Sequence, residues 1–211
     1  TDKGLGPEVD YMALRREEDR SFAALMGVDR LVWADLPEAP HRGYVKATLF
    51  GPPHEEDRIG PAVKERLAPL MNELRPDVVF APQALGHHVD HVQLVRVLPM
   101  LGVEPSRTLW YRDTPYAVRQ PGARPDASLP DGLRPLAVEV TAELPRKVSG
   151  CQCYRTQVGF QFGGVRAVGP TLEAFHEREA RAQGRPGRAE VFLAAPVLAA
   201  DVWEALGSKP S

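Results

Sequence analysis

The fold is decided by residues 77–91, which read DVVFAPQALGHHVDH. Residues 77–81 form a short apolar run, typical of a strand that is buried on both faces of a parallel sheet. A loop over residues 82–89 follows at once, and a helix is predicted over residues 90–101. A strand that leads through a short loop into a helix is the unit from which α/β sheets are built.

The same alternation of strands and helices extends in both directions from this stretch. Strands are predicted at residues 30–34, 108–111, 137–140 and 189–194, and helices at residues 14–26, 61–74, 143–154 and 172–182. The pattern predicts a three-layer α/β domain with a largely parallel sheet. Residues 112–135 hold five prolines, and we expect this long connection to overhang the site and to shape substrate choice. An extended surface connection without a role is an equally good interpretation.

Composition excludes several classes of function. The 26 basic and 28 acidic side chains give a net charge of −2, and no basic stretch is present, which excludes nucleic-acid binding. The longest apolar runs fall short of the ~20 residues that a membrane span needs. Cys151 and Cys153 are too close in sequence for the usual disulfide geometry, so free thiols and a reducing, cytoplasmic location are expected.

Residues 86–91 hold the densest cluster of chemically capable side chains, beyond the carboxyl end of the predicted strand, where α/β sheets place their active sites. His88 and His91 are three residues apart at a helix start, so one imidazole could bind a metal while the other contacts its substrate. Asp90 could orient an imidazole or cap the helix. These groups do not complete a catalytic zinc site, which usually takes three protein ligands.

The remaining histidines are scattered along the sequence, at His41, His54 and His176. Each is predicted to be a solvent-exposed side chain rather than a ligand. The acidic residues that follow His54 are predicted to form a solvated turn.

Several motifs in order resemble the LmbE/PIG-L family of zinc-dependent N-deacetylases over nearly the whole chain. They are Arg15 to Glu18 followed by Gly27-Val28, Asp35 to Pro37, Arg75 to Val79, Gly86 to His91 (the GxHxDH motif), Lys147 with Tyr154, Thr156 and Gln157, and Gly187 to Phe192. The GxHxDH motif is the most specific of them. The resemblance implies a Rossmann-like, LmbE-like fold.

The resemblance also implies roles for individual residues. His91 would be a zinc ligand, and His88 would be a catalytic residue that polarises the amide carbonyl or protonates the leaving amine. Asp90 would be a second catalytic residue, which tunes His88 and favours its charged form. Arg15 would bind a substrate hydroxyl or anionic group, although pairing with neighbouring carboxylates explains it equally well.

The sequence departs from the family at its start. The family begins with a strand that ends in HPDDE, which supplies two zinc ligands and the general base, and this sequence contains no HPDDE. Residues 1–4 resemble the end of the family's second strand. We therefore expect residues 1–211 to be a single deacetylase domain without its first strand–helix–strand unit, and to be inactive and poorly stable on their own.

The expected function is zinc-dependent removal of an N-acetyl group from an N-acetylglucosamine-type amino sugar or its conjugate. The implied cofactor is Zn²⁺ and the implied partner is a small amino-sugar substrate; homo-oligomerisation is left open. One alternative is an amidase that acts on a thiol conjugate. Another is a Rossmann-like binding module without catalysis, although no GxGxxG loop is present to hold a dinucleotide.

Overall fold

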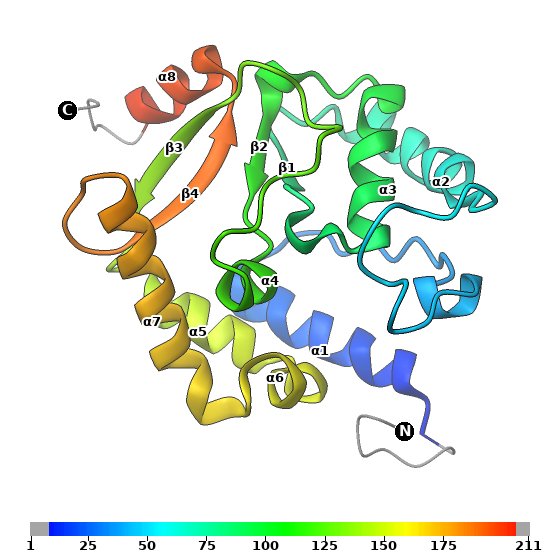
Figure 1. The fold of residues 1–211 in the computed structure, drawn as a ribbon, viewed down its shortest axis with the longest axis horizontal. Coiled ribbons are helices and arrows are strands. Elements are labelled where there is room, and N and C mark those ends of the chain that lie inside the picture. The colour runs from blue at the N-terminus through cyan, green and yellow to red at the C-terminus, as the bar shows by residue number, and fades with distance from the viewer. Residues whose placement is uncertain (1–8, 206–211) are drawn as a thin grey trace. The chain divides into compact units, whose positions relative to one another are not determined.

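The structure is a computed structural model that describes residues 9–205 (Figure 1). The chain divides into two compact units, Thr1–Trp33 with Ala137–Glu190 and Ala34–Leu136 with Val191–Ser211. We call the first the helical unit and the second the sheet unit. No helix in the described part is long and apolar enough to span a bilayer. Residues 1–4, which resemble a strand end, lie outside the described residues.

The sheet unit contains the strand, loop and helix predicted around residues 77–91. The helix α2 (Ile59–Leu74) leads to β1 (Val79–Pro82), and β1 leads to α3 (Val89–Val97). The other helices of this unit are η1 (Ala39–Arg42), η2 (Leu85–His87), η3 (Leu98–Leu101), η4 (Pro105–Arg107), α4 (Thr114–Arg119) and, near the C-terminus, α8 (Pro196–Ala205). The predicted helix over residues 90–101 changes to the 3₁₀ form of η3, because Pro99 has no N–H to continue the α-helical pattern.

The strands form a mixed sheet in the order β1-β2-β4-β3. β1 pairs in parallel with β2 (Thr108–Tyr111), from Val79 opposite Thr108 to Pro82 opposite Tyr111. β2 pairs in antiparallel with β4 (Ala189–Ala194), and the last strand in the order is β3 (Arg134–Glu139). The α/β class is confirmed. Of these two strand pairs, β1 with β2 is parallel and β2 with β4 is antiparallel. The long stretch of sequence between β2 and β4 allows the two strands to pair in either direction.

The core of the sheet unit joins the inner face of α3 to β1 and β2. Its buried members are Ala81, Ala84, Val92, Val95, Leu98, Val103 and Trp110. The loop between β1 and α3 is therefore anchored at both ends by packed apolar side chains, which holds its histidines in place.

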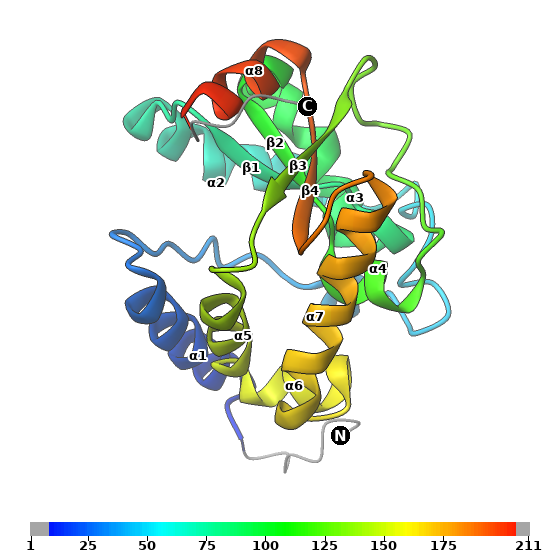
Figure 2. The same ribbon diagram turned by 90° about the vertical axis from the view of Figure 1, so that its left-hand side faces the viewer.

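The helical unit consists of α1 (Tyr11–Met26), α5 (Leu144–Gln152), α6 (Arg155–Phe162) and α7 (Val165–Ala182), which gather in one group (Figure 2). Leu144, Val158, Val168 and Leu172 form its buried core. α7 begins before Pro170, earlier than the predicted helix over residues 172–182, because Val168 and Leu172 both bury their side chains on one helix face.

The predicted strand at residues 30–34 is wrong. No strand in the described part of the chain pairs with this segment, and Leu31 and Val32 are 37% and 47% exposed. Trp33 instead lies against α1, where its indole N–H donates to Asp19 at 2.8 Å and its ring lies 5.2 Å from the Arg20 guanidinium. A β-branched and apolar run is not sufficient for a strand, which needs a partner for its N–H and C=O groups.

Within the helical unit, the carboxylate of Glu18 connects two of the motifs: the RxxE motif on α1 and the segment that contains Thr156 on α6. The carboxylate accepts from the Thr156 backbone N–H at 2.7 Å and from the Thr156 hydroxyl at 2.8 Å, at the start of α6. Glu18 is 9% exposed, so these bonds are shielded from water. The carboxylate thus caps α6 from α1, which gives this part of the RxxE motif a structural role.

We expect Glu18→Ala to lower the free energy of unfolding by about 1–3 kcal/mol, because it leaves two donors of Thr156 without their acceptor. Glu17→Ala is the matched control on the same helix, since Glu17 forms an exposed pair with Arg20 and such pairs contribute about 0–1 kcal/mol. Urea denaturation of both variants measures the difference. Equal stabilities would contradict the capping role of Glu18.

His176 is not the solvent-exposed side chain that the sequence suggested. His176 is fully buried on α7, on the same helix face as the buried residues Leu172 and Ala180. Its Nδ1 donates to the Ala189 carbonyl oxygen at 2.8 Å. Its Nε2 has no hydrogen-bond partner among the described residues. Burial lowers the pKa of His176, and Lys147 acts in the same direction.

The protein should therefore lose stability as the pH falls through the ordinary histidine range. The unfolded chain takes up a proton near pH ~6.5, whereas buried His176 takes it up at lower pH, so protonation favours unfolding below ~6.5. Melting temperatures between pH 7.5 and pH 5 should fall less steeply in His176→Asn, which keeps a donor for Ala189, than in the wild type. His41→Asn, at an exposed position, is the control and should keep the wild-type slope.

Candidate functional site

The loop between β1 and α3 is tightly folded. Ala84, Gly86 and His87 have φ values of 53°, 78° and 55°, in the left-handed region that residues other than glycine adopt infrequently. The Leu85 N–H donates to the Asp113 carboxylate at 2.9 Å, and the His87 N–H donates to the Ala84 carbonyl at 2.9 Å. The constrained backbone places His88 and His91 on the first turn of α3 with their ring centroids 5.3 Å apart.

His88 is the N-cap of α3. Its Nδ1 accepts from the Asp90 backbone N–H at 3.3 Å, so the proton of the neutral ring is on Nε2. Burial lowers the pKa of His88, and His91 acts in the same direction, while Asp90 opposes them. Asp90 thus favours the charged form, as expected, but burial outweighs it and the neutral imidazole is favoured.

His91 is oriented by a carboxylate that sequence reasoning missed. Its Nδ1 contacts Oδ1 of Asp113, whose side chain is 0% exposed and whose Oδ2 accepts from Leu85. A carboxylate bound to Nδ1–H fixes the tautomer with the lone pair on Nε2, which is how metal-binding histidines are commonly held. Asp113 lies two residues beyond the end of β2, the parallel neighbour of β1, and its position at the same sheet edge is the signal that could have identified it.

Asp90 lies in a network that extends away from the histidines. Its Oδ1 pairs with Arg42 at 2.8 Å, whereas its Oδ2 is 3.9 Å from His88 Nδ1. Arg42 also pairs with Asp57 at 3.1 Å, and Asp57 accepts from the Tyr44 hydroxyl at 2.9 Å. The geometry favours a structural role for Asp90, which anchors the start of α3 to η1, over direct contact with His88.

Two expectations about the segment around His54 have different outcomes. The Asp57 side chain is 2% exposed, so the predicted solvated turn is wrong at this residue. Burial raises the pKa of Asp57, but the bonds that it accepts from Arg42, Ile59 and Tyr44 outweigh burial and lower it overall. His54 is exposed, as predicted, and its ring stacks on Tyr44 with centroids 4.1 Å apart. This segment supports Arg42, and we assign no ligand to it.

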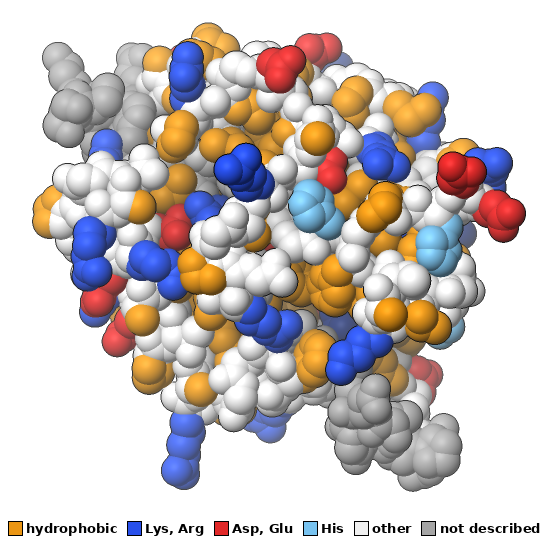
Figure 3. Space-filling view, in the orientation of Figure 1, with side chains coloured by type: hydrophobic (Ala, Val, Ile, Leu, Met, Phe, Trp, Pro, Cys, Tyr) orange, Lys and Arg blue, Asp and Glu red, His pale blue; other side chains and the backbone are white. Residues whose placement is uncertain are grey.

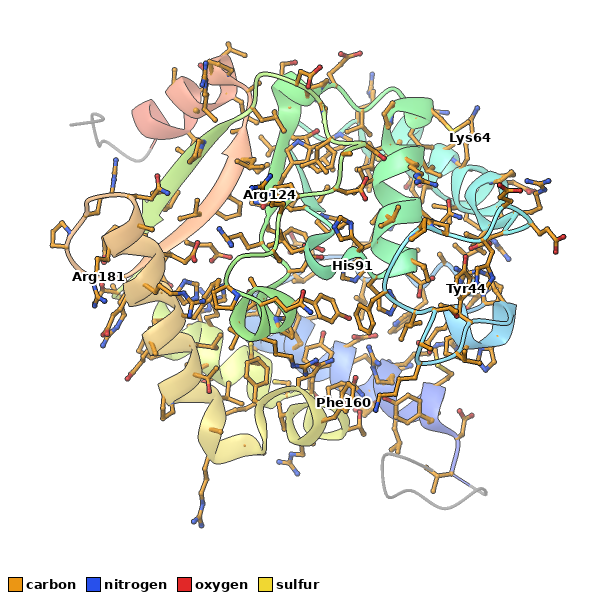
Figure 4. All side chains as sticks on the ribbon, in the orientation of Figure 1. Tyr44, Lys64, His91, Arg124, Phe160 and Arg181 are labelled. Carbon is orange, nitrogen blue, oxygen red and sulfur yellow. The ribbon has the colours of Figure 1, made fainter. Side chains whose placement is uncertain are left out.

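The proline-rich segment contacts the histidine loop, and its influence on substrate choice stays a prediction. Asp113 and Tyr116 lie beside His91, and Asp126 pairs with His87 at 3.2 Å. Next to this pair is a cavity of about 300 Å³, lined by Gly51, Pro52, His87, Val92, Arg96 and Asp126. Figure 4 labels His91 on α3, and Figure 3 shows histidine side chains that reach the surface on this face of the sheet unit.

Arg15 lies on α1, in the helical unit, whereas His88, Asp90 and His91 lie together in the sheet unit. Its guanidinium lies 6.0 Å from the Tyr11 ring. The neighbouring carboxylates of Glu18 and Asp19 accept from Thr156 and Trp33. Substrate binding by Arg15 stays a prediction.

The described residues provide only part of a metal-binding site. His91 presents an imidazole with a backing carboxylate, which suits a zinc ligand. Within residues 9–205, however, no group of three or more His, Cys, Asp or Glu side chains is placed to hold a metal ion. The described residues therefore supply one oriented ligand and not a complete zinc site.

Comparison with known proteins identifies relatives of this chain. Residues 2–100 match the PIG-L family, described as GlcNAc-PI de-N-acetylase. The 2'-N-acetylparomamine deacetylase of Streptomyces fradiae is 34% identical over 148 residues, which are 68% of this chain and 53% of that protein. The chain thus spans about half the length of this curated relative.

Solved structures agree with the fold. The deacetylase of the A40926 pseudoaglycone is 22% identical with a TM-score of 0.65, over 91% of this chain and 74% of that chain. The zinc-inhibited form of a teicoplanin deacetylase is 19% identical with a TM-score of 0.65, over 90% of this chain and 76% of that chain.

The chain shares the α/β fold of these two structures. The chain belongs to the PIG-L/LmbE family, and the resemblance inferred from its motifs is confirmed.

Proposed function

We propose that the protein is a zinc-dependent hydrolase that removes the N-acetyl group of an N-acetylglucosamine-type amino sugar or its conjugate. The observation that carries the proposal is the pair His88 and His91 on one helical turn, with His91 backed by buried Asp113. The name of the relative 2'-N-acetylparomamine deacetylase supports an N-acetylated amino sugar as the substrate class.

His91 would bind the metal through Nε2, and Asp113 would hold its tautomer and orientation. When bound, zinc supplies a Lewis acid and lowers the pKa of a bound water to about 7. The described residues contribute one ligand, so the proposal requires ligands from outside them. We assign no general base among the described residues.

His88 would act on the substrate carbonyl. Its lowered pKa favours the neutral ring, and its Nδ1 is occupied by the Asp90 N–H. The remaining Nε2–H is a donor that can stabilise the oxygen of the tetrahedral intermediate. Because burial favours the neutral ring, we favour polarisation of the carbonyl over protonation of the leaving amine as its first task.

The proposal is tested by incubating the full-length gene product with N-acetylglucosamine and with an N-acetylated aminoglycoside, and measuring free amine and acetate. Activity that a chelator removes and added zinc restores would support it. Release of amine that is unaffected by chelation would overturn the metal requirement. No release from any N-acetylated sugar would overturn the activity.

The absence of a three-ligand cluster among the described residues favours one second candidate, a binding module without catalysis. Calorimetry distinguishes it, since a module would bind an amino sugar without turnover. An amide-linked thiol conjugate in the same assay tests the amidase alternative, which predicts a faster reaction with the conjugate than with the free N-acetylated sugar.

A further inference from the structure

Tyr116 is positioned by the same residue that orients His91. It lies on α4, and its backbone N–H donates to the Asp113 carbonyl oxygen at 2.9 Å. The Asp113 side chain contacts His91. One residue therefore sets the positions of the His91 imidazole and of the turn that carries Tyr116.

The Tyr116 ring contacts both histidines of the candidate site. It stacks on His88 with centroids 6.0 Å apart and planes inclined by 18°, and it meets His91 in an edge contact with centroids 5.7 Å apart. Phe50 adds an edge contact to Tyr116 and another to His88, each with centroids 5.4 Å apart. Phe50 is itself held there by a β-bridge to His88.

The glycine of the GxHxDH motif makes room for this ring. A Cβ atom at Gly86 would lie 3.2 Å from Tyr116 Cβ and 3.4 Å from Tyr116 Cγ, which is tighter than ordinary van der Waals contact. Gly86 also has a φ of 78°, which disfavours other residues. Close approach of Tyr116 is therefore built into the loop that carries His88.

The Tyr116 hydroxyl has no donor or acceptor among the residues that the structure describes, whereas the Tyr44 hydroxyl donates to Asp57 at 2.9 Å. The Tyr116 side chain is half-buried, so part of it remains accessible to a bound molecule. A phenol is a hydrogen-bond donor near neutral pH. The structure therefore places a phenol donor beside the imidazoles of His88 and His91.

We propose that Tyr116 is a further catalytic residue, whose hydroxyl donates a hydrogen bond to an acceptor oxygen of the N-acyl amino sugar bound beside His88 and His91. This inference rests on the proposed function. The ring contacts position the phenol, and the hydroxyl provides the contact with the substrate.

The test compares kcat and KM of the wild type, Tyr116→Phe and Tyr111→Phe in the deacetylation assay. Tyr116→Phe keeps the ring and removes the hydroxyl, and kcat/KM should fall about 10-fold, as for the loss of one hydrogen bond between neutral groups. Zinc content and melting temperature should stay at wild-type values, which a merely structural role would not produce. A change in kcat identifies the acyl oxygen as the acceptor, and a change in KM identifies a sugar oxygen.

Tyr111→Phe is the matched control, because Tyr111 is also a half-buried tyrosine, on β2, with no described ring contact to either histidine. It should keep the wild-type kcat/KM. An active wild type with an unchanged Tyr116→Phe would overturn the role of Tyr116 alone. A wild type without activity on any N-acetylated sugar would overturn the proposed function, and the role of Tyr116 with it.

Discussion

Asp113→Asn should lower zinc affinity by about 10–100-fold, the usual effect of losing a carboxylate behind a metal-binding histidine. The substitution preserves shape, and the Asn oxygen can still accept from Leu85. The amide NH₂ would then face His91 Nδ1 and donate to it. This moves the ring proton to Nε2, the nitrogen that the proposed function assigns to the metal.

Asp126→Asn is the matched control for this prediction. Asp126 is also a carboxylate of the proline-rich segment that pairs with a histidine, but its partner is His87, whose side chain is 46% exposed. Zinc content after dialysis against buffers of defined free zinc should fall in Asp113→Asn and stay unchanged in Asp126→Asn. Equal zinc affinity in the two variants would show that Asp113 does not act through a metal ligand. Direct replacement, His91→Ala, should lower zinc content further.

Local patterns predicted the elements around the site well. The helix over residues 61–74 is observed as α2 (Ile59–Leu74), and the strand over residues 77–81 as β1 (Val79–Pro82). Both depend on short-range features: an apolar stripe at helical spacing, and a continuous apolar run between turn residues. Their order along the chain was sufficient to place the histidine loop beyond the end of β1.

The errors in the fold arise where long-range pairing decides the structure. Residues 30–34 have the composition of a strand but no described partner, so they remain irregular. The antiparallel pairing of β4 with β2 joins Trp110 to Leu193. A single sequence contains no local signal for the direction of such a distant contact.

The same limit explains which site residues were missed. His88 and His91 share one motif, so their spacing on a helix start was sufficient to predict their proximity. Asp113 and Arg42 reach the motif from other elements, through His91 and Asp90 respectively. His176 was misjudged because the sequence does not show which face of α7 is buried.

His88→Ala should lower kcat about 10²–10³-fold, the loss typical of removing one donor to an oxyanion. Zinc content should remain at the wild-type level, because His88 directs Nδ1 to the Asp90 N–H and, in the proposed function, its Nε2–H to the substrate. Loss of the N-cap bond costs about 0.5–2 kcal/mol of stability, which a melting curve measures separately.

His87→Ala is the matched control for His88, since it removes the adjacent imidazole, which pairs with Asp126 and makes no cap bond to α3. Its kcat should remain within a few-fold of the wild-type value. A second variant, His88→Asn, offers an acceptor for the Asp90 N–H but no imidazole donor, so it should regain stability without regaining activity. Recovery of activity in His88→Asn would assign His88 a structural role, because only the helix cap would then be needed for turnover.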